Sequence, residues 1–345
     1  MTQSLTLTKP DDWHVHFRDQ KALCHTVNAT AQTFGRALAM PNLQPPLTSV
    51  EMVQSYKERI AKHSPHGFTP YFSLYLTDDI QPSCLQATFS EPDILGAKLY
   101  PSGVTTNSKA GITSIQNLYP IFEVMQDLDL VLQIHGETIE DDIFDREKNF
   151  IDTQLAPLVK NFPRLRIVLE HISTKAACDF VQNAPNTVAA TITIHHLMFN
   201  RNDLLAGGIK PHFYCLPILK RAEDQQAVQA AALSGNPHFF LGTDSAPHAI
   251  EDKQSPCGCA GIYSAPHAIC LYAQFFEQHQ KLAALEPFAS HFGADFYRLP
   301  RNADTITLEK LPHPIPELLL FGDKKVRPLA AGLTIDWKLA DPLNN

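Results

Sequence analysis

Residues 130–135 read LVLQIH and residues 166–171 read RIVLEH, two short apolar runs that each end in a histidine. Both runs are apolar on both faces, which is typical of strands in a buried parallel sheet. Six further runs of this type lie along the chain, at Trp13–Phe17, Arg36–Met40, Thr69–Leu76, Ile94–Tyr100, Val188–His195 and Phe239–Thr243. The sequence therefore predicts eight strands.

Helix-like segments separate these runs. After residue 48 an apolar stripe includes Val50, Val53 and Ile60, and Thr48 with Glu51 predicts a capping box. Residues 113–127, 147–162, 174–184 and 221–234 are interpreted as helices as well. Eight strand–helix alternations predict an α/β fold, a (β/α)8 TIM barrel, with a doubly wound open sheet as the alternative. We expect a single barrel domain over residues 1–345, with residues from about 285 to 345 as a Pro-rich C-terminal extension packed on it.

Composition excludes several classes of protein. Hydrophobic residues make up 44% of the 345 residues and charged residues 19%, which argues against global disorder. The net charge of −8 argues against a broad nucleic-acid surface, although it allows a small cationic pocket. Seven cysteines, an odd number, fit a reducing compartment better than a disulfide framework. There is no apolar signal core in the first ten residues and no bilayer-length apolar stretch. We therefore expect a cytoplasmic protein with no membrane and no nucleic-acid partner.

Four histidines and one aspartate occupy the positions where predicted strands end. His14 and His16 lie two residues apart, so on a strand they point to the same face. His135, His171 and Asp244 each follow a different predicted strand. In a barrel all these ends lie on one rim, where active sites are found. The pattern favours a metal site, whereas each residue alone could be a hydrogen-bonded core histidine or a helix cap.

Lys98 lies inside the apolar run ILGAKLYP. Burial disfavours the ammonium form and therefore lowers the pKa of a lysine. Considered alone, Lys98 is best interpreted as a snorkelling or ion-paired side chain. A neutral amine could also add carbon dioxide and become a carbamate, but Lys98 by itself does not establish this.

Six motifs together resemble the type II dihydroorotases of the amidohydrolase superfamily, and the resemblance extends from about residue 5 to past residue 300. They are WHVHFRD (13–19), AMPN (39–42), GAKLYP (96–101), LQIHGE (132–137), LEHIST (169–174) and GTDSAPH (242–248). The resemblance implies two Zn²⁺ ions per subunit, bridged by N6-carboxylated Lys98. It assigns one ion to His14, His16 and Asp244 and the other to His135 and His171. It also implies a homodimer.

The resemblance implies the reversible cyclisation of N-carbamoyl-L-aspartate to (S)-dihydroorotate, a step of pyrimidine biosynthesis, with Asp244 as the catalytic proton carrier. We expect Arg18, on a continuation of the first strand, to face the same mouth and to match a carboxylate through two hydrogen bonds. The family holds the substrate carboxylate with residues matching Arg18, Asn42 and His248. Alternatively, Arg18 pairs with Asp19 or Asp12, and Asn42 is a turn residue.

The segment 101–112, PSGVTTNSKAGI, directly follows the Lys98 strand. Considered alone it is a loop between a strand and a helix. The resemblance implies that it closes over the substrate, that Thr105 and Thr106 reach the substrate, and that Leu216 and Ala260 contact it through backbone atoms.

Three other functions stay open from the residues. A hydantoinase or allantoinase would share the metal ligands, a mononuclear deaminase would not need Lys98, and a silent scaffold should have lost ligands. We interpret Cys257 and Cys259 as loop residues. His195 and His196 end the seventh run and receive no role.

Overall fold

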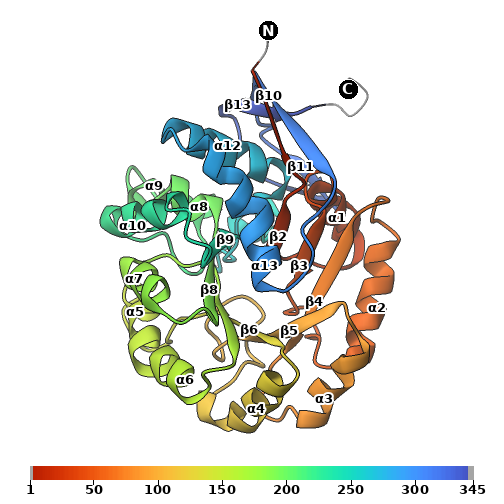
Figure 1. Ribbon diagram of the computed structural model, residues 1–345. Helices are drawn as coiled ribbons and strands as arrows, with labels where there is room; N and C mark the ends of the chain where they lie inside the picture. The colour runs from red at the N-terminus through yellow and green to blue at the C-terminus, as the bar shows by residue number, and fades with distance from the viewer. Residues whose placement is uncertain (1–2, 341–345) are drawn as a thin grey trace.

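Eight parallel strands form one sheet that curls into a nearly closed barrel (Figure 1). The computed structural model describes residues 3–340, apart from the side chain of Phe89, so the expected domain range 1–345 extends beyond it at both ends. The barrel strands are β2 (Asp11–Val15), β3 (Arg36–Ala39), β4 (Thr69–Tyr75), β5 (Ile94–Leu99), β6 (Val131–Ile134), β7 (Arg166–Leu169), β8 (Val188–Ile192) and β9 (Phe239–Leu241). All eight predicted strands are confirmed. Neighbouring strands follow in chain order without a switch point, so the doubly wound alternative is wrong.

The first and last barrel strands meet at a seam without a regular ladder. Across it the Asp244 N–H donates to the His14 carbonyl at 2.8 Å, and the His16 N–H donates to the Ser245 carbonyl at 3.0 Å. These two bonds join the ends of β2 and β9. The seam therefore brings His14, His16 and Asp244 together.

Several strands end before the residues at which the sequence predicted their ends. Strand β6 stops at Ile134 and β7 at Leu169, so His135 and His171 lie just beyond them. The prediction that His195 ends a strand is wrong, because β8 stops at Ile192 and helix α8 (Ile194–Met198) follows. The hydroxyl of Thr193 accepts the N–H of His196 and begins that helix.

Helices surround the barrel (Figure 1). They are α1 (Leu23–Ala31), α2 (Val50–Ala61), α3 (Pro82–Gln86), α4 (Tyr119–Asp127), α5 (Arg146–Phe150), α6 (Ala156–Asn161), α7 (Lys175–Asn183), α9 (Arg201–Leu205), α10 (Ala222–Leu233), α11 (Ile250–Lys253), α12 (Ala268–Gln278) and α13 (Phe292–Phe296). A π-helical turn, Ile151–Leu155, joins α5 to α6. The predicted cap of α2 is wrong by one residue, since Ser49, and not Thr48, accepts the Met52 N–H.

An apolar cluster fills the barrel below its open rim. It includes Val131, Val168 and Phe240 from three barrel strands. Trp13 stacks on Tyr297, which follows α13, with ring centroids 4.5 Å apart. The chain after residue 285 therefore packs against the interior of the barrel, and the carboxyl ends of the strands stay open for a site.

The C-terminal part of the chain pairs with the N-terminal strand. Strand β10 (Thr305–Pro314) lies between β1 (Ser4–Thr8) and β13 (Thr334–Leu339) in an antiparallel sheet, and β11 (Leu319–Phe321) pairs with β12 (Lys324–Val326). The three-stranded sheet of β1, β10 and β13 lies at the top of the view in Figure 1. The sequence did not predict β1, because its hydrogen-bonding partner lies about 300 residues away.

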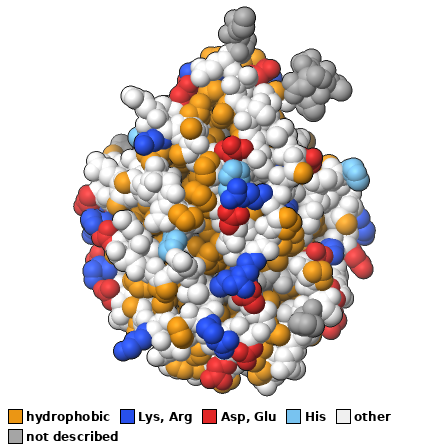
Figure 2. Space-filling view, in the orientation of Figure 1, with side chains coloured by type: hydrophobic (Ala, Val, Ile, Leu, Met, Phe, Trp, Pro, Cys, Tyr) orange, Lys and Arg blue, Asp and Glu red, His pale blue; other side chains and the backbone are white. Residues whose placement is uncertain are grey.

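The surface carries both charges. On the face drawn in Figure 2, Lys and Arg side chains are interspersed with Asp and Glu. Of the helices in residues 3–340, none has the length and apolar character needed to cross a membrane.

Candidate metal centre and active site

A small cavity opens at the carboxyl ends of the barrel strands. Eleven of the thirteen predicted site residues line it, together with Tyr100, Ala246 and Gly261; the eleven are His14, His16, Arg18, Asn42, Thr105, Thr106, His135, His171, Leu216, Asp244 and Ala260. Of the other two, Lys98 is fully buried in β5, and His248 lines the adjoining outer groove. The structure thus gathers the residues that the sequence predicted for one rim.

Three donors meet at the barrel seam. The Nε2 atoms of His14 and His16 lie 3.3 Å and 3.1 Å from Asp244 Oδ1. The two Nε2 atoms are 3.2 Å apart. All three side chains are buried, and one ligand atom from each lies within 4.8 Å of the others. This is a donor set that a divalent metal ion fits.

Two further histidines lie beside this group. The ring of His171 lies 5.0 Å from that of His14 and 4.8 Å from that of His135, between ring centroids. His171 Nδ1 is buried and has no hydrogen-bond partner in residues 3–340. Burial lowers the pKa of His16 to about 4 and the pKa of His171 well below its usual value. Both imidazoles are therefore neutral at pH 7, which is the form that binds metal ions.

Lys98 is ion-paired with Glu170, and both side chains are fully buried. The other carboxylate oxygen of Glu170 lies 3.0 Å from His14 Nδ1. Burial lowers the pKa of Lys98 well below its usual value. The ion pair is the simpler of the two interpretations of Lys98, and it involves a residue that the sequence analysis missed.

Glu170 and Glu137 each contact a ring nitrogen of one of these histidines through a carboxylate oxygen. Glu170 contacts His14 Nδ1, and His135 Nε2 donates to Glu137 Oε2 at 2.9 Å. Such carboxylate partners orient metal-binding imidazoles. Both lie inside the motifs LEHIST and LQIHGE, so a buried acid within two residues of a candidate ligand was the available signal. Tyr100, whose buried hydroxyl has no partner in the described chain, was also missed.

Arg18 lies at the mouth of the cavity, but not on a continuation of the first barrel strand as the sequence predicted. Strand β2 ends at Val15, and Arg18 has a positive φ of 61°, so the strand does not continue. Its Nη2 donates to His248 Nε2 at 2.9 Å, and its Nε donates to the Pro247 carbonyl at 3.0 Å. The alternative pairing with Asp19 or Asp12 is wrong, because Asp19 binds Arg59 and Asp12 binds Thr243.

The loop of residues 101–112 lies across the cavity mouth. Asn42 Nδ2 donates to the Thr106 carbonyl at 3.1 Å on one side. On the other side Thr106 Oγ1 donates to the Ala260 carbonyl at 3.2 Å. The same carbonyl lies 3.0 Å from His248 Nε2. The loop therefore joins opposite parts of the rim.

The cysteines form no disulfide. All seven are free thiols, and the Sγ atoms of Cys257 and Cys259 lie 3.8 Å apart in a loop. Cys215 is buried near His195 and His196, outside the cavity lining.

Comparisons with known proteins agree with this site. Residues 11–312 match the model of the amidohydrolase family. A dihydroorotase of Aliivibrio fischeri is 56% identical over 337 residues, which cover 97% of this chain and 98% of that protein. The crystal structure of a dihydroorotase from Campylobacter jejuni superposes with a TM-score of 0.92 at 36% identity, covering 99% of this chain and 98% of that one. A Saccharomyces cerevisiae dihydroorotase in complex with 5-fluoroorotic acid gives a TM-score of 0.90 at 36% identity, over 98% of both chains. The chain therefore belongs to the amidohydrolase family and, within it, to the dihydroorotases.

Proposed function

We propose that this protein interconverts N-carbamoyl-L-aspartate and (S)-dihydroorotate at a centre of two zinc ions bridged by carboxylated Lys98. The observation that carries the proposal is the composition of one cavity. Nitrogen and oxygen donors gather at its floor, and the guanidinium of Arg18 lies at its mouth. A cyclic amide bearing a carboxylate fits this combination, and the relatives named dihydroorotase support it.

The proposed donor sets follow the two histidine groups. His14, His16 and Asp244 would hold one zinc ion, and His135 and His171 would hold the other. The neutral imidazoles and the unpartnered Nδ1 of His171 support the assignment. When bound, zinc supplies a Lewis acid for the amide carbonyl and lowers the pKa of water towards 7.

Carboxylation would change the charge at Lys98. The ammonium ion first loses one proton, and the neutral amine then adds CO₂ through a new N–C bond and releases a second proton, so a carbamate anion replaces the ammonium ion. The present attraction to Glu170 would then become a repulsion between two buried anions. Cations beside the carbamate would have to balance this charge, so carboxylation and metal loading should depend on each other.

The chain's own residues account for proton transfer and substrate binding. Asp244 would take the proton of the attacking water and pass it to the departing ring nitrogen in the hydrolytic direction. Arg18, Asn42 and His248 would bind the substrate carboxylate and hold the amide in place. Thr105 and Thr106 would contact the substrate from the loop, and Leu216 and Ala260, which also line the cavity, would contact it through their backbones. The loop would exclude water from the cavity.

The substrates of hydantoinases and allantoinases have no carboxylate that could pair with Arg18. The position of Arg18 at the mouth of the cavity therefore favours dihydroorotate as the substrate. The assembled donor set and buried Lys98 also disfavour a silent scaffold and a mononuclear deaminase. A cytoplasmic location and a homodimer are further parts of the proposal. Light scattering coupled to size-exclusion chromatography tests whether the protein is a homodimer.

The test is an ultraviolet assay of dihydroorotate consumption by purified protein, with hydantoin and allantoin as comparison substrates. We expect turnover of dihydroorotate, its loss after treatment with a chelator, and its return when zinc is added. Turnover of hydantoin or allantoin alone would overturn the proposed substrate. Full activity in protein shown to be free of metal would overturn the proposed centre.

A further inference from the structure

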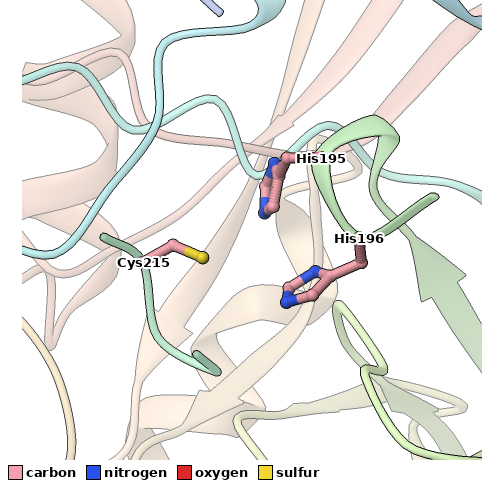
Figure 3. A group of neighbouring side chains, drawn as sticks. All are labelled: His195, His196 and Cys215. Atoms are coloured by element: carbon pink, nitrogen blue, oxygen red, sulfur yellow. The ribbon is translucent and has the colours of Figure 1, made fainter. Parts of the chain in front are cut away.

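Three side chains of types that can bind metal ions lie close together, as Figure 3 shows. None of the three lines the cavity. His195 and His196 come from helix α8, directly after strand β8, and Cys215 comes from the segment that follows the short helix Pro211–Phe213. One ring nitrogen of each histidine and the cysteine sulfur all lie within 4.8 Å of one another. All three residues are buried, with His195 at 0% exposure.

The hydrogen bonds of this cluster are incomplete. Neither ring nitrogen of His195 has a partner in residues 3–340, although both are buried. An unpartnered buried polar group destabilises the fold, because it has lost its hydrogen bonds to water and gained none in the protein. The two unpartnered nitrogens of the buried His195 imidazole therefore destabilise the folded protein, unless one of them binds a metal ion.

The other two members surround a single carbonyl oxygen. His196 Nε2 lies 3.1 Å from the Pro217 carbonyl oxygen, and Cys215 Sγ donates to the same oxygen at 3.2 Å. His196 Nδ1 lies 2.8 Å from Thr193 Oγ1, which fixes the orientation of the ring. This second bond is the kind of support that metal-binding histidines have.

We propose that His195, His196 and Cys215 form an additional site for a thiolate-binding divalent ion such as Zn²⁺. Two imidazoles and one thiolate are typical zinc ligands, and the Pro217 carbonyl is the nearest oxygen for a fourth position. Donors around tetrahedral zinc lie about 3.5 Å apart. Small side-chain rotations would therefore bring the present cluster to that geometry.

The charges near the cluster favour a metal ion that is bound by a thiolate. A cation at this cluster would add positive charge to a buried region that already holds Lys220, which is paired with Glu137 at 3.6 Å. Loss of the thiol proton supplies a compensating negative charge on Cys215 when the metal binds. Soft thiolate ligands favour zinc over magnesium or calcium. The cluster is therefore expected to bind zinc or cobalt and to ignore the hard cations.

A metal ion bound at this site would stabilise one wall of the cavity. Cys215 is adjacent in sequence to Leu216, which lines the cavity. A metal ion there would tie this segment to helix α8. This consequence rests on the proposed function, whereas the metal site itself does not.

Cobalt titration of the metal-free protein tests the site. A thiolate bound to Co²⁺ gives a charge-transfer absorption in the near ultraviolet, and the proposed catalytic centre contains no sulfur ligand. We expect this absorption in the wild-type protein. Magnesium should not compete with cobalt for it, and zinc should abolish it.

Three variants assign the sulfur and the imidazole. The band should persist in C257S/C259S, which removes the other neighbouring thiols, and should disappear in C215S. H195Q keeps the thiol and removes a ring that has no hydrogen bond to lose, so it should fold normally. It should weaken cobalt binding, read from the band, by at least about tenfold.

A missing band in the wild-type protein would overturn the site. So would a band that survives C215S, is lost in C257S/C259S, or has unchanged cobalt affinity in H195Q. The outcome is separate from the proposed function, because dihydroorotate turnover with chelator sensitivity is measured independently of the thiolate band.

Discussion

The carboxylate of Asp12, in the first barrel strand, accepts the backbone N–H of Thr243 at 2.8 Å and its hydroxyl at 2.6 Å, just beyond the last strand. The His14 N–H also points to this carboxylate, at 3.2 Å. A single buried side chain therefore satisfies donors on both sides of the seam that carries the first group of metal donors.

Replacing Asp12 tests this seam. D12A leaves buried donors of Thr243 and His14 without their acceptor, so we expect the free energy of unfolding to fall by about 3 kcal/mol or more. D12N keeps one acceptor oxygen and should lose much less. Urea unfolding followed by circular dichroism measures both, and equal stability of D12A and wild type would contradict the closing role.

Asp244 is expected to carry the proton. An amide cannot accept one, so D244N should lower kcat by about 10²–10⁴-fold in both reaction directions. Because Asp244 is also a proposed ligand, zinc content must be measured on the same sample. D252N, at the neighbouring outer groove, is the matched control and should retain wild-type kcat. D244N activity within a few-fold of wild type would show that another group moves the proton.

Lys98 is expected to carry the carbamate. K98A should lose nearly all turnover, and short carboxylic acids such as acetate should restore part of it by supplying a bridging carboxylate. Wild-type protein loaded with zinc and ¹³C-bicarbonate should show a carbamate carbon signal by NMR that K98A lacks. K57A, which changes an exposed lysine paired with Asp93, is the control. Unrescued K98A protein with full zinc occupancy and activity would exclude the carbamate.

Arg18 is expected to bind the substrate carboxylate. R18M removes charge-assisted hydrogen bonds, so KM for dihydroorotate should rise by about 10–100-fold, with a smaller change in kcat. R164M changes an exposed arginine that pairs with Asp127 and should leave KM unchanged. If R18M lowers kcat alone, Arg18 acts in the chemical step and not in binding.

Glu147 gives an expected pH dependence of stability. Burial raises its pKa from 4.5 to about 7, while it accepts the N–H of Ser173 at 3.0 Å and a hydroxyl of Thr174. Because the folded-state pKa is raised, its protonated form stabilises the fold fully below pH 4.5, and this contribution disappears as the pH rises through 7. The loss corresponds to roughly 3 kcal/mol.

The E147Q variant isolates that contribution, because glutamine does not titrate. The free energy of unfolding of the wild type should fall more steeply between pH 4.5 and pH 7 than that of E147Q. Parallel curves for the two proteins would show that Glu147 does not titrate in this range.

Local patterns were enough to predict the barrel. Runs such as 130–135 and 166–171 are apolar on both faces, and this pattern is typical of strands buried on both sides. Since parallel strand ends share one rim, the histidines and Asp244 could be placed together without coordinates. The positions of strand ends were less accurate, as Thr193 and Ser49 show, because caps depend on single hydrogen bonds.

What the sequence by itself determined is the order of the strands and the residue types at their ends, since both follow from periodicity along the chain. Only the tertiary structure decided the partners of those residues: Glu170 with Lys98, Arg18 with His248, Cys215 beside His195, and β1 with β10. These pairs lie tens to hundreds of residues apart. Their contacts exist because barrel closure brings distant segments together, and no local pattern in the sequence encodes that distance.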